Sequence, residues 1–112
     1  MILFLKFWDA NQEDLFQILR AKFDIFIFMK NMTFCVSEPI NNEPATHGNG
    51  STIGFKIKTP ELGDRWHAAG IENGGTSCED PPGIRQGDGF KMYLAYLKDP
   101  SGNKLCGFLN VN

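Results

Sequence analysis

The sequence predicts a small α+β fold built from two related modules, the first of them abbreviated. In the second half of the chain, segments with strand and helix patterns follow one another in the order strand, helix, strand, strand, strand. The first half gives strand, helix, strand, strand, which is the same order one strand short. The chain has 112 residues, of which 42% are apolar and ten are Phe, so it can bury a core. We expect one domain, with residues 1–38 as the first module, 39–50 as a linker and 51–112 as the second module.

The first half contains apolar segments that predict three strands and one helix. Residues 1–8 form a dense apolar run that is too short to cross a bilayer and favours a strand. Residues 23–30 and 33–37 are rich in β-branched and aromatic side chains, which also favours strands. The helix is predicted from four residues at the spacing of a single helical face: Leu15, Ile18, Leu19 and Lys22.

The second half opens with a strand and a capped helix. Residues 52–58 alternate between two faces, so Thr52 and Lys56 lie on one face and Ile53 and Ile57 on the other. Helix-start chemistry follows at once, because Thr59 offers a capping oxygen and Pro60 suits the first helical position. The helix is expected to bury one side, to end at a pair of glycines, and to include these residues: Leu62, Trp66, Ala69, Gly74 and Gly75.

Three more strands are expected after the helix. They are a short strand within 76–80, a long one over 89–98 and a last one over 104–109. Pro81-Pro82-Gly83 is expected to form a turn, and Arg85 is expected to lie in this connection between strands. Residues 99–103, with the sequence Asp-Pro-Ser-Gly-Asn, predict a tight turn, because Pro fixes φ early and Gly allows positive φ later.

Composition excludes several classes of protein. The net charge of −2 and the lack of a basic stripe argue against a nucleic-acid partner, and no segment suits a membrane span. The cysteines are Cys35, Cys78 and Cys106, an odd number with wide spacing and no Cys-x-x-Cys pair. A disulfide scaffold and a structural zinc site are therefore not expected, and a reducing cytoplasm is the simplest location.

Four short segments point to a known family. The Asp99–Asn103 turn is the most specific, and Pro44-Ala45-Thr46, His67-Ala68-Ala69 and Gly74-Gly75 add to it. Together they resemble the carboxyl-terminal module of glyoxalase and bleomycin-resistance proteins, in the vicinal-oxygen-chelate superfamily that includes extradiol dioxygenases. The likeness extends back to Phe34. It implies paired βαβββ modules whose mixed sheet curls into a cup, with the helices outside, around a substrate and often a divalent metal.

The resemblance also implies positions for metal ligands, and this chain departs from them. Where many relatives have a His, at the start of the second module's first strand, this chain has Thr52. Where many have a Glu in the last strand, it has Cys106, and residues 1–8 contain no His. Only Glu38 matches a remaining carboxylate position. One thiolate and one carboxylate do not form a three- or four-ligand site, so we expect no metal and no other cofactor.

The resemblance makes five residues candidates for binding a small molecule in the cup: Thr52, Lys56, Tyr93, Tyr96 and Cys106. Lys56 is either an anion-binding group or a solvated surface lysine. Cys106 is either a reactive thiol or a small buried hydrophobe. Tyr93 and Tyr96 are three residues apart on one strand, so they point to opposite faces and one of them should line the cup.

Three other residues have open roles. His47, in the linker, is either a base at the cup rim or a solvated loop residue. His67 is expected to pack at the surface beside Trp66. Arg85 is either a clamp for a ligand carboxylate or a solvated loop residue.

The function expected from this pattern is metal-free binding of a small molecule, and no catalytic residue is identified. One alternative is a lyase related to lactoylglutathione lyase, or a dioxygenase-like enzyme. Another is a degenerate, non-catalytic relative. Because a missing strand in the first module leaves a sheet edge unpaired, we also expect a homodimer that covers this edge.

Overall fold

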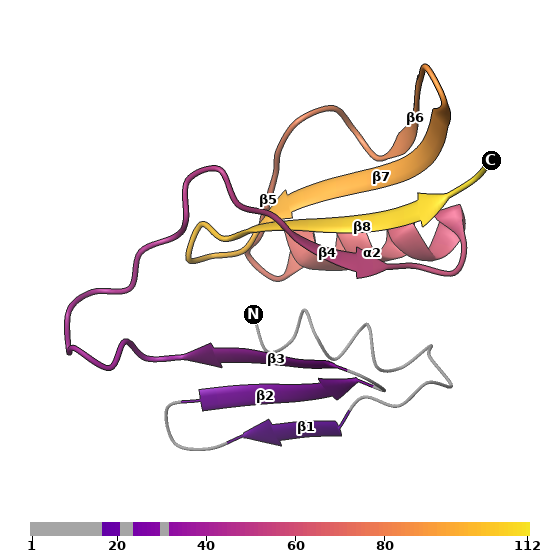
Figure 1. Ribbon diagram of the computed structural model, residues 1–112. Coiled ribbons are helices and arrows are strands. Elements are labelled where there is room, and N and C mark those ends of the chain that lie inside the picture. The colour runs from indigo at the N-terminus through magenta and orange to yellow at the C-terminus, as the bar shows by residue number, and fades with distance from the viewer. Residues whose placement is uncertain (1–16, 21–23, 30–31) are drawn as a thin grey trace. The chain divides into compact units, whose positions relative to one another are not determined.

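The computed structural model describes residues 17–20, 24–29 and 32–112, which divide into two compact units between Ala45 and Thr46 (Figure 1). The first unit contains a three-stranded sheet. The second contains a five-stranded sheet and one helix. The strand predicted over residues 1–8 lies outside the described residues. No helix among those that the structure describes has the length and apolar character needed to cross a membrane.

The first unit is an antiparallel sheet in the order β1-β2-β3. The predictions of strands over 23–30 and 33–37 are confirmed. The helix predicted across residues 15–22 is wrong where the structure describes it, because Gln17–Arg20 is a strand that pairs with β2. Four residues at helical spacing are a weak signal, and strand pairing overrides it. The strands are β1 (Gln17–Arg20), β2 (Asp24–Met29) and β3 (Met32–Ser37).

The second unit has the mixed sheet and single helix of an α+β fold. β4 and β8 are parallel neighbours, β7 pairs with β8, and both β5 and β6 pair with the other edge of β7. The elements are β4 (Ile53–Lys56), α2 (Pro60–Glu72), β5 (Thr76–Ser77), β6 (Gly83–Gly87), β7 (Phe90–Lys98) and β8 (Lys104–Asn110).

β6 occupies a segment where a turn was expected. Residues Gly83–Gly87 pair with β7, so Arg85 lies on a strand opposite Met92 and not in a turn. The reversal comes later, at Asp88-Gly89, where Gly89 has a φ of +80°. Asp-Gly between two extended segments strongly indicates a hairpin, so the sequence does contain the information that places β6 before β7.

The helix begins and ends as its capping residues predict. The Thr59 hydroxyl accepts a hydrogen bond from the Leu62 amide at 3.2 Å, and Pro60 is the first helical residue. At the other end, Gly74 has a φ of +95° and the Gly75 amide donates to the Gly70 carbonyl at 2.8 Å. These caps fix the length of α2 and therefore the start of β5.

α2 covers one face of the second sheet (Figure 1). On that face the core is formed by Trp66, which is 2% exposed, with buried strand residues Tyr93, Ala95, Leu97 and Leu105. Gly107 gives Trp66 room, because a Cβ on this glycine would lie 3.2 Å from the indole ring.

The other face of this sheet, which we call the distal face, points away from α2. Directly opposed residues of paired strands share a face. Tyr96 opposes Cys106, Leu94 opposes Phe108 and Lys98 opposes Lys104, while β4 adds Gly54 and Lys56 beside β8. A Cβ on Gly54 would lie 3.2 Å from the Phe108 ring, which confirms that these two residues share the distal face.

Candidate functional site

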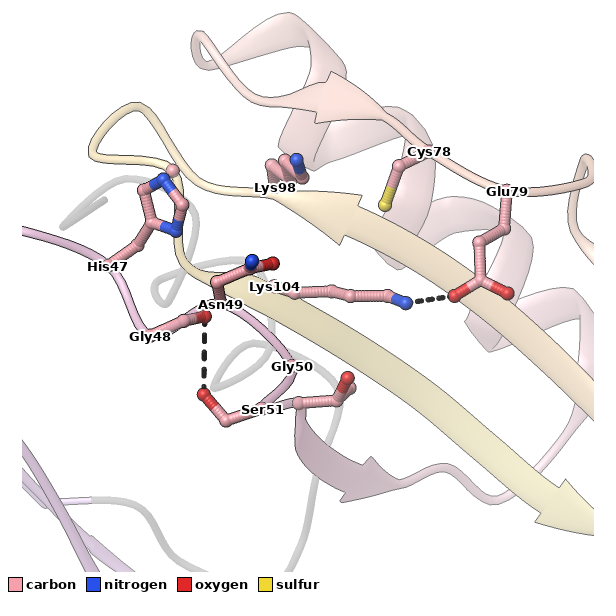
Figure 2. A pocket seen from close by; sticks show the side chains of 11 residues that line it. His47, Gly48, Asn49, Gly50, Ser51, Cys78, Glu79, Lys98 and Lys104 are labelled. Carbon is pink, nitrogen blue, oxygen red and sulfur yellow. Dashed lines mark hydrogen bonds and ion pairs between the residues drawn. The ribbon is translucent and has the colours of Figure 1, made fainter.

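A polar pocket lies at the end of the distal face, within the second unit (Figure 2). Its volume is about 370 Å³. The linker before β4, the residues after β5 and the hairpin between β7 and β8 contribute its walls. The lining residues are His47, Gly48, Asn49, Gly50, Ser51, Thr52, Cys78, Glu79, Lys98, Gly102 and Lys104.

One wall forms where the linker meets the β7–β8 hairpin. Gly102 has a φ of +90°, and its missing side chain lets the His47 ring approach, since a Cβ there would lie 2.9 Å from His47 Cδ2. The Ser51 hydroxyl donates to the Gly48 carbonyl at 3.4 Å, and Gly50 has a φ of +97°. The linker and the Asp99–Asn103 turn therefore meet at one side of the pocket.

The charged wall contains Lys104 and Glu79. The Lys104 ammonium pairs with the Glu79 carboxylate (Figure 2) and lies 4.8 Å from the centroid of the Tyr96 ring. This pairing raises the pKa of Lys104 above its ordinary value. The two side chains are 30% and 45% exposed, so the pair is a solvated surface contact that contributes little to stability.

Tyr96 and Cys106 lie next to this pocket on the distal face. They oppose each other on β7 and β8, and the Cys106 thiol donates to the Gly107 carbonyl at 3.5 Å. Burial raises the pKa of Cys106 and the pKa of Tyr96 above their ordinary values. Cys106 is therefore a neutral thiol near neutral pH, which argues against a nucleophilic role.

We expect Cys106 to react with iodoacetamide at least about tenfold more slowly than Cys78, because the thiolate is the reactive species. Cys106 is 5% exposed with a raised pKa, whereas Cys78 is partly exposed and its sulfur points into the pocket (Figure 2). Peptide mass spectrometry at timed intervals measures both rates in one sample. Equal rates in the folded protein would contradict the buried, protonated state of Cys106, and denatured protein supplies the reference.

Four of the five residues predicted to bind a small molecule lie on or beside the distal face. Thr52 lines the pocket, Tyr96 and Cys106 are adjacent to it, and Lys56 lies beside Phe108 farther along the sheet.

Tyr93 differs, because it lies on the face that α2 covers. It is 2% exposed, and its hydroxyl donates to Asp64 Oδ1 at 2.6 Å. Burial raises the pKa of Tyr93 well above its ordinary value. Tyr96 is thus the one of the two tyrosines that faces the site.

Several lining residues were not among the sequence candidates. Lys98 and Lys104 flank the five-residue turn symmetrically, so their direct opposition could have been inferred from the turn itself. No sequence pattern points to Glu79, because only the folded chain brings it to the pocket.

Of the residues with open roles, His47 lines the pocket and Arg85 does not. The Arg85 guanidinium donates to the carbonyls of Asp80, Pro81 and Gly83 at 2.9, 3.0 and 3.2 Å. It therefore holds the segment between β5 and β6, and its hydrogen-bonding capacity is largely used there.

His67 packs between α2 and β5. Its Nε2 lies 3.0 Å from the Ser77 hydroxyl, and burial lowers the pKa of His67 below 6.5. Because the folded pKa lies below the unfolded value, the unfolded chain binds more protons in the interval between them. The contribution of His67 to the free energy of unfolding is therefore fully present above the unfolded pKa. It is lost as the pH falls through 6.5 towards the folded pKa.

We expect urea denaturation on either side of pH 6.5 to show this loss, and H67Q to reduce it. Both proteins are compared over the same pH values, so other titrating groups affect them equally. An unchanged slope of stability against pH in the variant would show that His67 is not the responsible group.

The donor atoms at the positions implied for a metal do not form a site. Thr52 offers a hydroxyl and Cys106 a thiol whose pKa is raised, although metals bind the thiolate. Within residues 17–20, 24–29 and 32–112 there is no group of three or more His, Cys, Asp or Glu side chains placed to hold a metal ion. The part of the chain before residue 17 is not described, so metal-free binding stays a prediction.

Comparison with solved structures gives clear similarities. A glyoxalase/bleomycin resistance protein from Albidiferax ferrireducens is 47% identical, with a TM-score of 0.84, over 95% of this chain and 85% of that one. A glyoxalase/bleomycin resistance protein/dioxygenase family enzyme from Burkholderia phytofirmans is 17% identical, with a TM-score of 0.66, over 96% and 87%. A bleomycin resistance determinant encoded on transposon Tn5 is 16% identical, with a TM-score of 0.50, over 87% and 80%. No protein-family model and no curated protein matches the chain.

Proposed function

Because the chain belongs to the glyoxalase/bleomycin resistance protein family, we propose that it binds a small organic molecule on the distal face without a divalent metal. The observation that carries this proposal is the polar pocket of about 370 Å³ beside Tyr96. A volume of this order suits a small ligand. One structural relative is named for resistance to bleomycin, which is consistent with a binding role.

The residues have distinct roles in this proposal. The Tyr96 ring supplies a flat surface for the body of the ligand. Thr52, Ser51 and Asn49 supply hydroxyl and amide groups at the pocket wall. Cys106, buried and protonated, contributes a small apolar contact beside Tyr96. Lys56, farther along the face, contacts only a ligand that extends beyond the pocket.

Binding is preferred to catalysis for a chemical reason. A lyase-like or dioxygenase-like reaction of this family would need a set of metal-binding donors, and the residues that the structure describes provide a hydroxyl and a protonated thiol instead. We therefore propose a metal-free binding protein. The wide spacing of its cysteines, without a Cys-x-x-Cys pair, favours a cytoplasmic location.

We further propose that it acts as a homodimer. Within the described residues, the sheet of the first unit has three strands, and β1 and β3 are its edges. An uncovered strand edge is a site for pairing with another chain. Light scattering during size-exclusion chromatography measures this directly, and a monomer at high protein concentration would refute the dimer.

Metal content and ligand-induced stabilisation test the binding proposal together. We expect protein purified without chelator to contain far less than one metal ion per chain. We also expect a panel of small aromatic compounds to include members that raise the melting temperature, because a ligand that binds only the folded state stabilises it. Chelator treatment should leave this stabilisation unchanged.

The variants Y96A and Y93F separate the distal face from the helix-covered face. Y96A should remove ligand stabilisation, whereas Y93F should lower the melting temperature of the free protein and retain the ligand effect. Stoichiometric metal with chelator-sensitive stabilisation would contradict the proposal.

A further inference from the structure

The pocket contains two cationic side chains that oppose each other. Lys98 and Lys104 are directly paired across β7 and β8, at the start of the hairpin, and both line the pocket. Directly opposed like charges destabilise a strand pair unless an anion lies near them. Glu79 is the acidic side chain of the lining, so the lining has two lysines against one carboxylate.

Glu79 reaches Lys104 from an unusual backbone conformation. It has a φ of +58°, in the left-handed region that side chains other than Gly, Asn and Asp seldom adopt. It lies just beyond the two-residue strand β5 and is 45% exposed. Strained residues of this kind cluster at ligand sites. The Glu79 side chain can therefore leave Lys104 without breaking a strand or a buried contact.

The surroundings of Lys104 suit the charged end of a planar molecule. The Tyr96 ring lies below its ammonium, with 4.8 Å between the nitrogen and the ring centroid. Asn49 and Thr52 also line the pocket, whereas the Ser51 hydroxyl is directed at the Gly48 carbonyl (Figure 2). An oxyanion in the pocket would meet the Lys104 cation and the neutral hydrogen-bonding groups of Asn49 and Thr52.

From these contacts we infer that the pocket binds the anionic group of its ligand, a carboxylate or a phosphate, at Lys104 and Lys98, and that Glu79 occupies this place when no ligand is bound. This inference rests on the proposed binding function and adds the chemical class of the ligand. Glu79 is then an internal competitor, because its carboxylate pairs with Lys104 and an anionic ligand must displace it.

Matched anionic and neutral probes test the inference by calorimetry and by protein-detected NMR. The pairs are benzoate with benzamide, and phenyl phosphate with phenol. We expect the anionic member to bind at least about tenfold more tightly, the size of effect that a charge-assisted contact gives. Phosphate and carboxylate sources are distinguished by which of the two anionic probes binds more tightly.

Three variants locate the effect. K104M and K98M should each weaken binding of the anionic probe and leave the neutral probe unchanged. E79Q should strengthen binding of the anionic probe several-fold, because the competing charge is gone while the side-chain size is kept. The matched control is K91M, an exposed lysine of β7 that does not line the pocket, and it should bind both probes as the parent protein does.

A measurement on the unaltered protein keeps the inference testable if a variant fails to fold. Raising the salt concentration from about 0.05 to about 0.5 M should weaken binding of the anionic probe and leave binding of the neutral probe unchanged. Equal affinity for both members of each pair, or E79Q binding the anion more weakly, would overturn the inference while leaving the proposed function standing. Absence of binding by every probe, together with an inactive thermal-shift panel, would instead contradict both.

Discussion

W66A should lower the free energy of unfolding by about 3 to 5 kcal/mol, the usual cost of removing a large aromatic side chain from a core. Trp66 is 2% exposed, and the bare backbone of Gly107 contacts its ring. The backbone of β8 cannot move inward to fill the space, because β8 pairs with both β4 and β7. The cavity therefore stays open, and urea denaturation followed by circular dichroism measures the loss.

The matched control for this change is I71A on the same helix. Ile71 is 42% exposed, so its truncation should cost less than about 1 kcal/mol. A loss for W66A no larger than the loss for I71A would mean that α2 is not packed on the sheet through Trp66. The assignment of the two sheet faces would then fail with it.

D99A is expected to cost about 2 to 3 kcal/mol, because it removes a buried carboxylate that accepts three charge-assisted hydrogen bonds. Asp99 is 4% exposed and begins the β7–β8 turn. Its Oδ1 accepts from the amides of Ser101 and Asn103, and its Oδ2 accepts from the Asn103 side chain, each at 2.9 Å. The same turn carries Gly102 against His47, so the variant should also weaken ligand binding at the pocket.

The control is D88A, in the exposed turn between β6 and β7, which should cost less than about 1 kcal/mol. D99N keeps one acceptor oxygen and should fall between the parent protein and D99A. Equal stability of D99A and D88A would show that the carboxylate hydrogen bonds do not hold the hairpin.

Local chemistry explains which parts of the fold the sequence predicted. Thr59, Pro60 and Gly74 fix the ends of α2 through contacts a few residues apart, so their effect is readable from the chain alone. The turn at Asp99–Asn103 is equally local, although its main stabilising group is the Asp99 carboxylate and not only the Pro and Gly that signalled it.

The errors arise where pairing between strands decides the structure. Ile18 and Leu19 fit a helical face as well as a strand, and pairing with β2 places them in a strand. β6 was missed because its pairing with β7 depends on the Asp88-Gly89 reversal.

In the candidate site, too, some features follow from the local sequence and others only from the folded structure. Period-two alternation separates Tyr93 from Tyr96 in the sequence, but only the position of α2 determines which of them is buried. Thr52 was named from the resemblance and lines the pocket. Glu79 comes to Lys104 through the short strand β5 and the unpaired segment that Arg85 holds, and no local pattern encodes that approach.

Mapping of ligand contacts by NMR on chelator-treated, isotope-labelled protein tests the central claim most directly. The compound that stabilises the protein most is titrated, and the backbone amide shifts are followed. Metal-free binding on the distal face predicts saturable shifts at Thr52, Tyr96 and Lys104, with little change at Trp66 on the helix-covered face. Shifts confined to α2, or binding that appears only after a divalent metal is added, would contradict it.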